Sequence, residues 1–529
     1  MRCADHARLH PAGPGAAAEL CRNLLATDVE QRAPQLAIRS RLLLARTTSG
    51  AEAALLLDEA TSAAAGLGRP ELRFDLGLAR ALADRDAGRL REAAQTLRVV
   101  VEGRASWEPV SPLPARGAAA PDLVQVTDEL ISVLLEIGDH DAVIEAWQRA
   151  RVAKNGRFDQ LARRTAGWSP VADEPHPATP ADDRPLSLGM ELQPAVLPAV
   201  PEGPLVEYYV LDGDVIAFVV REGQVHVRRL PGTSAPARRA LAGWRQERLL
   251  VATHLAGPDQ TTSPALEALR VHLVEPLADL VADLCEELRE EPGAAVLTVI
   301  GHRHLHDVPF DALFEQLGHQ PPATVRAEPD LDLEPEQELP TRHAPVLVLA
   351  VPDDRAPLVE KEAAMIGELL PASEVAVGEE ATRKRLFASA PAAELVHIAC
   401  HGTFRHGNPL FSALHLADGW LRAADVVADG LELNGAVVVL SACSSGGGSE
   451  LSREPLGLAW AFVEAGAAGV VASLWDVDDA ATLELMTHFY GALADGQYPQ
   501  VALRTARRAV AERYPHPYYW AAFRYFARP

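Results

Sequence analysis

The chain has 529 residues, of which 48% are hydrophobic and 23% charged, and it carries a formal net charge of −24. A chain of this length exceeds one ordinary hydrophobic core, so about two to four domains are expected. The acidic balance excludes a nucleic-acid-binding body, which would need a basic face, and no apolar run approaches the roughly 18 residues that predict a membrane-spanning helix.

The amino terminus and the cysteines both favour a cytoplasmic location. Asp5 and His6 follow closely on Met1, without the apolar segment that a secretory signal needs. The five cysteines are odd in number and widely scattered, which is untypical of a disulfide framework. We therefore expect reduced thiols and no membrane partner.

Residues 15–165 carry small and apolar residues at helical spacing and show no strand-like alternation. Gly50, Gly88 and Gly138 each stand at a turn before a new helix. The first two lie 38 positions apart, near the period of about 34 residues of tetratricopeptide (TPR) repeats, and the next interval, of 50, includes a proline-rich excursion near residues 107–120. Most aromatic positions of that pattern are missing. We predict an all-helical, TPR-like repeat domain over residues 1–167, with a generic array of helical hairpins as the alternative. Either would offer a concave surface to an activating or recruiting protein.

Residues 168–204 are rich in Pro, Asp and Ala, a composition that cannot bury a core and that predicts a linker. Three strands of a meander are expected next, within residues 205–230. Two amphipathic helices should follow, over about 235–255 and 263–290. Residues 205–290 would form the first part of a larger domain that spans residues 205–529.

From Ala294 onward strands alternate with helices, the pattern of a parallel sheet. An acidic, proline-containing run at residues 328–338 interrupts this pattern; we expect a solvated loop, with a self-cleaved or inhibitory segment as the alternative. The predicted strands of this catalytic sheet, residues 294–529, are 295–300, 346–351, 394–399, 436–440 and 469–474. The predicted helices are 358–370, 380–389, 455–465, 478–495 and 498–513.

Two of these predicted strands end in a reactive side chain. One apolar, β-branched run leads to His401 and Gly402, and the next leads to Cys443 and a glycine-rich stretch. Such runs are typical of buried parallel strands, and the residues just past them lie in the crevice where open α/β sheets place their sites. His401 and Cys443 could therefore meet there as base and nucleophile.

These strand ends resemble the His-Gly and Ala-Cys signatures of caspase-like cysteine proteases. The flanking residues narrow the resemblance to the CHAT family, relatives of caspases and separase that are usually preceded by TPR-type helices. The resemblance covers about residues 200–529 and implies a caspase-like α/β fold: a doubly wound, mostly parallel sheet with flanking helices, preceded by the all-α repeat domain. Cys400 departs from the family pattern, which commonly has Thr or Ser there. The matching segments are 304–313, 360–363, 381–382, 408–414, 455–467, 471–482 and 519–523.

The resemblance assigns roles to these residues. Cys443 would be the nucleophile, and His401 would take its proton and later protonate the leaving amine. Gly402 would let the chain turn, and its N–H would join that of Cys443 in stabilising the oxyanion. No Asp or Asn that could orient the histidine is evident, and the resemblance implies a dyad without one. No cofactor is expected.

Structural interpretations compete with these roles. Cys443 could be a buried thiol, but the small residues of 441–448 favour an accessible one. His397, Cys400 and His401 are near enough in sequence to suggest a metal site, but side chains diverge along a strand and no second cluster of ligands exists, so we predict no metal. The three histidines at positions 302, 304 and 306 are expected to be structural or solvated.

Three acidic residues follow the predicted strand 469–474. By analogy with a similar stretch in separase, Asp476 is the candidate carboxylate that selects Arg or Lys before the scissile bond. Asp478 and Asp479 are better explained as capping the next helix.

The sequence thus predicts a cytoplasmic, bacterial-type cysteine endopeptidase that cleaves a specific protein and is regulated by partner binding to the helical region. The glycine-rich residues 444–449, with 452–454, would form an activation loop. One alternative is a catalytically silent CHAT/TPR adaptor in a signalling or conflict system. Another is a non-proteolytic hydrolase or transferase that uses the same dyad. Residues 445–449 lack the Gly-Lys-Ser/Thr of a phosphate-binding loop, so no nucleotide is expected.

Overall fold

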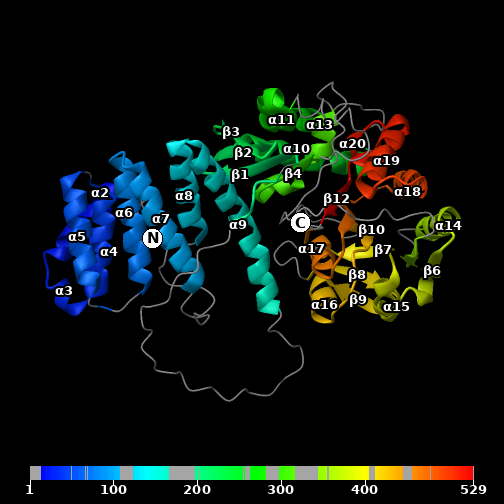
Figure 1. The fold of residues 1–529 in the computed structure, drawn as a ribbon, viewed down its shortest axis with the longest axis horizontal. Coiled ribbons are helices and arrows are strands. Elements are labelled where there is room, and N and C mark those ends of the chain that lie inside the picture. Colours follow the sequence, from blue (N-terminus) through cyan, green and yellow to red (C-terminus); the bar gives the residue numbers. More distant parts are fainter. Residues whose placement is uncertain are drawn as a thin grey trace, which may run out of the picture. The chain divides into compact units, whose positions relative to one another are not determined.

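The fold is known from a computed structural model (Figure 1). The described part of the chain forms two compact units, which are treated separately: a helical unit up to Arg157 and an α/β unit that includes everything from Val200 onward. Among the described residues, no helix combines the length and the apolar character that a membrane span requires. The predicted boundaries at residues 167/168 and 204/205 stay predictions. The structure describes residues 13–48, 50–65, 67, 70–107, 123–165, 197–201, 203–253, 255, 263–281, 297–315, 344–353, 357–403, 411–444, 456–476 and 478–527.

The amino-terminal region is all-helical where it is described, as predicted. Successive helices pack as antiparallel neighbours, α4 on α5, α6 on α7 and α7 on α8. Gly50, Gly88 and Gly138 have φ values of 65°, 75° and 68°, so each adopts the left-handed conformation that a tight turn between helices requires. The helices are α2 (Gly13–Leu25), α3 (Val29–Arg32), α4 (Pro34–Ala45), α5 (Ala51–Ala65), α6 (Pro70–Asp86), α7 (Leu90–Trp107), α8 (Leu123–Ile137) and α9 (His140–Thr165).

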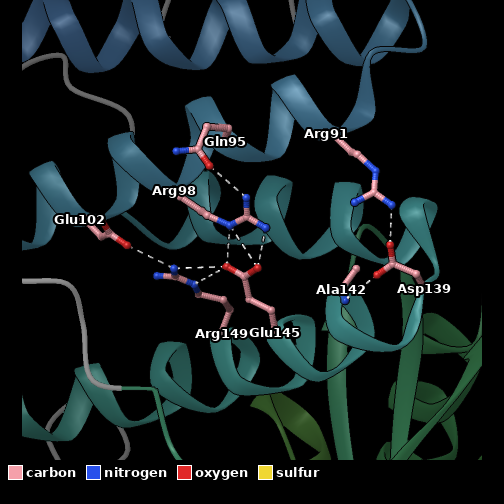
Figure 2. Close-up of polar contacts among 8 residues, drawn as sticks. All are labelled: Arg91, Gln95, Arg98, Glu102, Asp139, Ala142, Glu145 and Arg149. Atoms are coloured by element: carbon pink, nitrogen blue, oxygen red, sulfur yellow. Dashed lines mark hydrogen bonds and ion pairs between the residues drawn. The ribbon is translucent and has the colours of Figure 1, made fainter.

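Ion pairs join α7 to α9 (Figure 2). Arg98 donates from Nε to Oε1 of Glu145 at 2.9 Å and from Nη2 to Oε2 at 2.6 Å. Arg149 lies between Glu145 and Glu102, with Nη2 at 3.3 Å from a carboxylate oxygen of each. Burial alone would raise the pKa of Glu145, but the hydrogen bond and charge of Arg98 outweigh it and hold this pKa below its ordinary value.

Replacing Glu145 by Gln should weaken the contact between α7 and α9 at neutral pH by about 1 kcal/mol. The folded-state pKa is depressed, so the stabilisation is present above the unfolded pKa of about 4.3 and is lost as the pH falls through the folded value. The difference between wild type and variant should therefore shrink below about pH 4. Hydrogen exchange of the α7 and α9 amides in the full chain measures this loss of stability. Glu92→Gln, on the exposed side of α7, is the control. Equal protection in wild type and Glu145→Gln at pH 7 would contradict the prediction.

A four-stranded sheet begins the α/β unit, in the order β3-β2-β1-β4. The meander is as predicted, but β4 pairs in parallel with β1 and does not begin the catalytic sheet. The helix predicted over about 263–290 is interrupted: α11 ends at Leu273, and a 3-10 turn at Glu275–Leu277 contains Pro276, which lacks the N–H that would continue the helix. Residues 278–281 are helical again, and the rest of the predicted helix lies outside the described residues. The elements are β1 (Leu205–Leu211), β2 (Asp214–Arg221), β3 (Gln224–Leu230), β4 (Thr298–Ile300), α10 (Ser234–Ala252), α11 (Pro264–Leu273) and α13 (Phe310–Glu315).

The second sheet has eight strands in the described part of the chain, with the path β12-β11-β10-β7-β5-β6 and a hairpin β8–β9 attached to β7. Its central strands are parallel and buried, and β12 runs antiparallel at the edge. This is the α/β sheet that the sequence predicts, with β6, β8, β9 and β12 added. The strands are β5 (Val346–Ala350), β6 (Ser373–Val377), β7 (Leu395–Thr403), β8 (Ala413–Leu416), β9 (Gly419–Arg422), β10 (Val437–Ser444), β11 (Gly469–Ser473) and β12 (Phe523–Ala527).

Helices flank this sheet, and two of them matter for the site. Helix α14 packs on β5, β6 and β7, and it also contacts α18. The apolar residues of these helices join the strands in one continuous core. The helices are α14 (Val359–Leu369), α15 (Arg383–Ser389), α16 (Ala423–Ala428), α17 (Leu456–Glu464), α18 (Asp479–Ala494), α19 (Pro499–Arg513) and α20 (Pro517–Trp520).

Two buried arginines connect the segment after β4 to the end of the second sheet. Arg507 on α19 donates to Asp311 at 2.6 Å and also to the carbonyl of Phe523. Arg524 on β12 donates to the carbonyl of His306 at 3.1 Å and to that of Val308. Burial lowers the pKa of Arg524 to about 10, so it still carries its charge at neutral pH. The contacts of Arg524 join segments that lie more than two hundred residues apart in the chain, and Arg507 and Asp311 lie 196 residues apart.

Candidate catalytic site

His401 and Cys443 lie opposite each other at the carboxyl ends of two neighbouring strands. Strands β7 and β10 are parallel, and their register pairs Cys443 with His401 and Ser444 with Gly402. The runs Val396–Ala399 and Val437–Leu440 are buried, which is why these residues form central strands. Neighbouring strands lie about 4.8 Å apart, so the register brings the backbones of the two predicted residues close together. The side chain of Cys443 lies outside the described part of the structure.

His401 has an acidic partner. Its Nε2 contacts the carboxylate of Asp353, which lies three residues beyond the end of β5, the strand on the other side of β7. Nδ1 of the same ring is buried and has no hydrogen-bond partner among the described residues. The expectation that no acidic residue orients this histidine is therefore wrong. The signal that could have revealed Asp353 is its place just past a predicted strand, at the same sheet edge as the dyad.

The first turn of α18 supplies further negative charge beside His401. Asp478 accepts a hydrogen bond from the Ala481 N–H at 2.9 Å and is the N-cap of the helix, as predicted. Burial raises the pKa of Asp479, and repulsion by the carboxylates of Asp478, Glu362 and Asp353 raises it further. The charge of His401 acts in the opposite direction, which places Asp479 within electrostatic reach of the imidazole.

A buried polar cluster lies beneath the strand ends. Glu362 on α14 accepts a hydrogen bond from Oγ of Ser441 at 3.2 Å, and its other oxygen is 3.0 Å from Nε2 of His397. The second contact is a close polar approach and not a hydrogen bond, since neither of its two atoms has a hydrogen-bond partner among the described residues. The hydroxyl of Tyr490 on α18 is 2.8 Å from Nδ1 of His397. His397 thus turns both ring nitrogens toward protein partners, as a structural residue does.

Gly402 differs from the prediction. Strand β7 continues through it to Thr403, with Ser444 on one side and Leu414 of β8 on the other, so the chain does not turn at this glycine. The reason is the β8–β9 hairpin, which extends the sheet past the dyad. Whether its N–H serves an oxyanion stays a proposal.

Residues 263–528, about half of the chain, match the family model of the CHAT domain. The chain belongs to the CHAT domain family. The match contains the whole second sheet, with His401, Cys443 and Asp353 at its edge.

Individual relatives of this CHAT protein are more distant. Tetratricopeptide repeat protein 28 from Homo sapiens is 29% identical over 205 residues, and the Mus musculus protein of the same name is 29% identical over 207 residues. Each alignment covers 32% of this chain and 8% of the relative, so the chain spans under a tenth of either curated relative. Two crystal structures of the Saccharomyces cerevisiae separase–securin complex are 11% and 10% identical, with TM-scores of 0.44 and 0.42. Each covers 97% of this chain and 48% of the yeast chain.

Asp476, the predicted specificity residue of the CHAT domain, is exposed just after β11. Arg248 on α10 lies near it, with its guanidinium 4.6 Å from the ring centre of Trp475 and 5.8 Å from that of Trp244. Burial lowers the pKa of Arg248 to about 10, and the charges of Asp307 and Asp476 act against that shift. A cation of the chain itself thus partly balances the charge of Asp476.

The remaining predictions concern histidines and loops. His302 accepts a hydrogen bond on Nδ1 from the Val210 N–H at 2.9 Å and stacks on Tyr209, so it is structural. Among the described residues no group of three or more His, Cys, Asp or Glu side chains could hold a metal ion. The acidic run 328–338 and the predicted activation loop, residues 445–449 and 452–454, lie outside the described residues.

Proposed function

We propose that this CHAT protein is a cysteine endopeptidase with Cys443 as nucleophile and His401 as base. The observation that supports this best is the paired register of these two residues at a sheet edge, combined with the contact of His401 to Asp353. A nucleophile, its base and a group that orients the base need such an arrangement: a thiol and an imidazole at one sheet edge, with a carboxylate in contact with the imidazole.

The geometry of His401 suggests how the proton moves. Asp353 occupies Nε2, so we assign Nδ1, buried and without a partner among the described residues, to the thiol of Cys443. Nδ1 would take the thiol proton, and the thiolate would attack the scissile carbonyl carbon. The imidazolium, stabilised by Asp353, would then protonate the leaving amine as the C–N bond breaks. Water, deprotonated by the same imidazole, would hydrolyse the thioester and free the enzyme.

The oxyanion of the tetrahedral intermediate would accept hydrogen bonds from the backbone N–H groups of Cys443 and Gly402. Each residue lies one position before the end of its strand, and the two occupy adjacent register positions on neighbouring strands, which supports a pair of donors at one point. Because Gly402 also pairs with Leu414, a donor role requires that its N–H face away from β8.

We propose Asp476 as the carboxylate that favours Arg or Lys before the scissile bond. Its exposure at the end of β11 and its negative charge suit a cationic side chain of a substrate. Because Arg248 already balances part of this charge, the preference should be modest.

Replacing Asp476 by Asn should lower kcat/KM for Arg- or Lys-containing peptides by roughly 10-fold and leave apolar peptides unaffected. Competition between matched peptides that differ at this one residue measures it. Asp495→Asn removes the same charge from an exposed position at the end of α18 and is the control. An equal change for basic and apolar peptides would remove Asp476 from the specificity site.

A partner protein would bind the helical region and thereby recruit or activate the enzyme. We propose that this binding regulates the cleavage of a specific protein substrate. The competing function is a silent adaptor in which the same fold serves as a scaffold. The pairing of Cys443 with His401 and the contact to Asp353 favour the enzyme, since an adaptor has no need for a nucleophile and an oriented base at one edge.

An electrophilic peptide probe separates these functions. The full chain is incubated with peptides carrying a thiol-reactive group, with and without cell lysate as a source of activator, and the modified residue is mapped by mass spectrometry. A protease should carry the probe on Cys443 in a manner that depends on peptide sequence. A non-proteolytic hydrolase should be labelled without regard to sequence, and an adaptor should stay unlabelled in every condition.

A further inference from the structure

Four buried side chains from four elements meet beneath the dyad, and the proposed chemistry uses none of them. They are Glu362 of α14, His397 of β7, Ser441 of β10 and Tyr490 of α18, with exposed fractions of 3%, 0%, 7% and 0%. Each is polar, and their contacts are directed at one another. An apolar core of the same volume would avoid the cost of burying these groups, so the cluster calls for an explanation.

The direction of the contacts follows from Glu362. A carboxylate can only accept, so the ring proton of His397 belongs on Nε2, the nitrogen 3.0 Å from Glu362. Nδ1 of His397 then accepts from the Tyr490 hydroxyl, 2.8 Å away, and burial keeps that phenol protonated by raising its pKa well above its usual value. Ser441 donates to the other carboxylate oxygen. Glu362 thus receives one contact from each of the two strands that carry the dyad.

The place of these contacts along the strands is informative. Ser441 precedes Cys443 by two residues, and His397 precedes His401 by four, so each belongs to the same strand face as its catalytic partner. At about 3.3 Å per residue, the contact on β10 lies roughly 7 Å from the nucleophile position. The same cluster reaches α18, whose first turn holds Asp479 beside His401.

We propose that Glu362 is a positioning residue, which holds the carboxyl ends of β7 and β10 through His397 and Ser441 so that His401 stays opposite Cys443. This inference rests on the proposed function of the dyad. Glu362 touches no substrate in it, and Tyr490 donates to Nδ1 of His397, whose Nε2 faces Glu362. The hydrogen bond from Ser441 and the 3.0 Å polar contact with His397, and not the charge of the carboxylate, are the properties that matter.

The Glu362→Gln variant would test that distinction. Its side-chain amide oxygen can accept from Ser441, and its NH₂ group can donate to Nε2 of His397. His397 then carries its proton on Nδ1 and donates to the hydroxyl oxygen of Tyr490. In Glu362→Gln the side chains at positions 362, 397, 441 and 490 therefore stay in contact, with the donor and acceptor roles of His397 exchanged. Glu362→Leu instead leaves Ser441 and His397 without this polar partner.

The reactivity of Cys443 reports on the dyad without any substrate or activator. The full-length chain is treated with iodoacetamide, and the alkylation rates of Cys443 and Cys21 are followed in the same molecule by mass spectrometry. Because a loss of alignment by about 1 Å can slow a reaction up to 100-fold, we expect Glu362→Leu to slow Cys443 by about 10-fold relative to Cys21. Glu362→Gln should stay within about 3-fold of wild type, and Tyr490→Phe should be slowed several-fold.

Tyr208→Phe is the matched control. Tyr208 is equally buried, and its hydroxyl donates to the Leu273 carbonyl at 2.8 Å in the other sheet. The two Tyr→Phe variants lose one buried hydrogen bond each, so they should lose similar stability, but only Tyr490→Phe should slow Cys443. If Glu362→Leu does not fold, Glu362→Gln and Tyr490→Phe still make the comparison.

The outcomes distinguish the inference from the proposed function. Wild-type rates in Glu362→Leu and Tyr490→Phe, with only melting temperatures lowered, would make the cluster structural and overturn the inference. A loss in Glu362→Gln as large as in Glu362→Leu would assign the effect to charge and also overturn it. Rapid alkylation that depends on His401 and on Glu362, without peptide cleavage either alone or with cell lysate as a source of activator, would support the inference and count against the protease. If His401→Ala leaves the alkylation rate of Cys443 unchanged, His401 and Cys443 do not act as a dyad, and both the inference and the proposed function are refuted.

Discussion

Cys443→Ala should abolish peptide cleavage, with a loss of at least about 10³-fold in kcat. Alanine has no nucleophile, so the acyl-enzyme cannot form, and only substrate binding and the oxyanion donors remain. The loss should appear in kcat, because the Cys443 side chain contributes little to substrate binding. Cleavage of a peptide library by wild type and variant, under conditions where wild type is active, measures the ratio.

Cys400→Ala is the matched control for this variant. Cys400 immediately precedes His401 but is buried in the core with an exposed fraction of 3%, so the same change there should leave kcat within a few-fold of wild type. Equal cleavage by wild type and Cys443→Ala would refute the proposed nucleophile. A comparable loss in Cys400→Ala would show that the core around β7, and not the nucleophile, limits the rate.

Asp353→Asn should lower kcat by about 10² to 10⁴-fold. The asparagine amide can donate to Nε2 of His401, which would force the ring proton onto Nδ1, the nitrogen that we assign to the thiol of Cys443. His401 could then no longer accept that proton. The neutral amide would also stabilise the imidazolium less than the carboxylate does. Steady-state kinetics on a cleaved peptide should show kcat reduced and KM nearly unchanged, since Asp353 contacts the base and not the substrate in this mechanism.

Asp478→Asn provides the comparison, because it removes the same charge near the same edge while asparagine caps a helix about as well as aspartate. Its kcat should stay within a few-fold of wild type. If Asp353→Asn and Asp478→Asn lose activity equally, the total negative charge at the sheet edge matters and Asp353 has no specific role. If neither variant loses activity, His401 acts without an orienting group, as the sequence had suggested.

The placement of His401 and Cys443 on neighbouring strands was accessible from the sequence, for a local reason. Each of β7 and β10 is a mostly apolar, β-branched run that leads to a reactive residue, and such a run is typical of a buried parallel strand. The helix that follows β11 was equally plain, with Asp478 as its cap. In these places local composition and tertiary structure point to the same arrangement.

Asp353 could not be found in this way, because its role depends on strand order. The apolar runs 295–300 and 346–351 look alike in sequence, and either could have been the neighbour of β7. The pairing of β5 with β7 places Asp353 beside His401. The run 295–300 contains β4, which pairs with β1 and so belongs to the first sheet. Periodicity identifies a strand but carries no information on its partner.

The missed strands have different explanations. Strand β6 lies at the sheet edge, is only partly buried and carries Glu374, so it lacks the apolar pattern of a central strand. The β8–β9 hairpin did have a signal: Asp418-Gly419 is a strong turn dipeptide between short alternating runs, and Gly419 has φ of 128°. Without that hairpin, the strand containing Gly402 looked as if it ended in a turn.

The antiparallel strand β12 sets an order of events in biosynthesis. It covers the outer edge of β11, and its Arg524 holds carbonyls of residues 306 and 308 near the start of the CHAT match. A ribosome releases residues from the amino terminus onward, so β7 and β10 emerge long before this strand can close the sheet. Until residues 523–527 have left the ribosome, β11 keeps an unpaired edge and the region after β4 lacks its arginine contacts. Cys443 therefore passes through translation on an incomplete sheet, which gains its last edge strand only once β12 has been made.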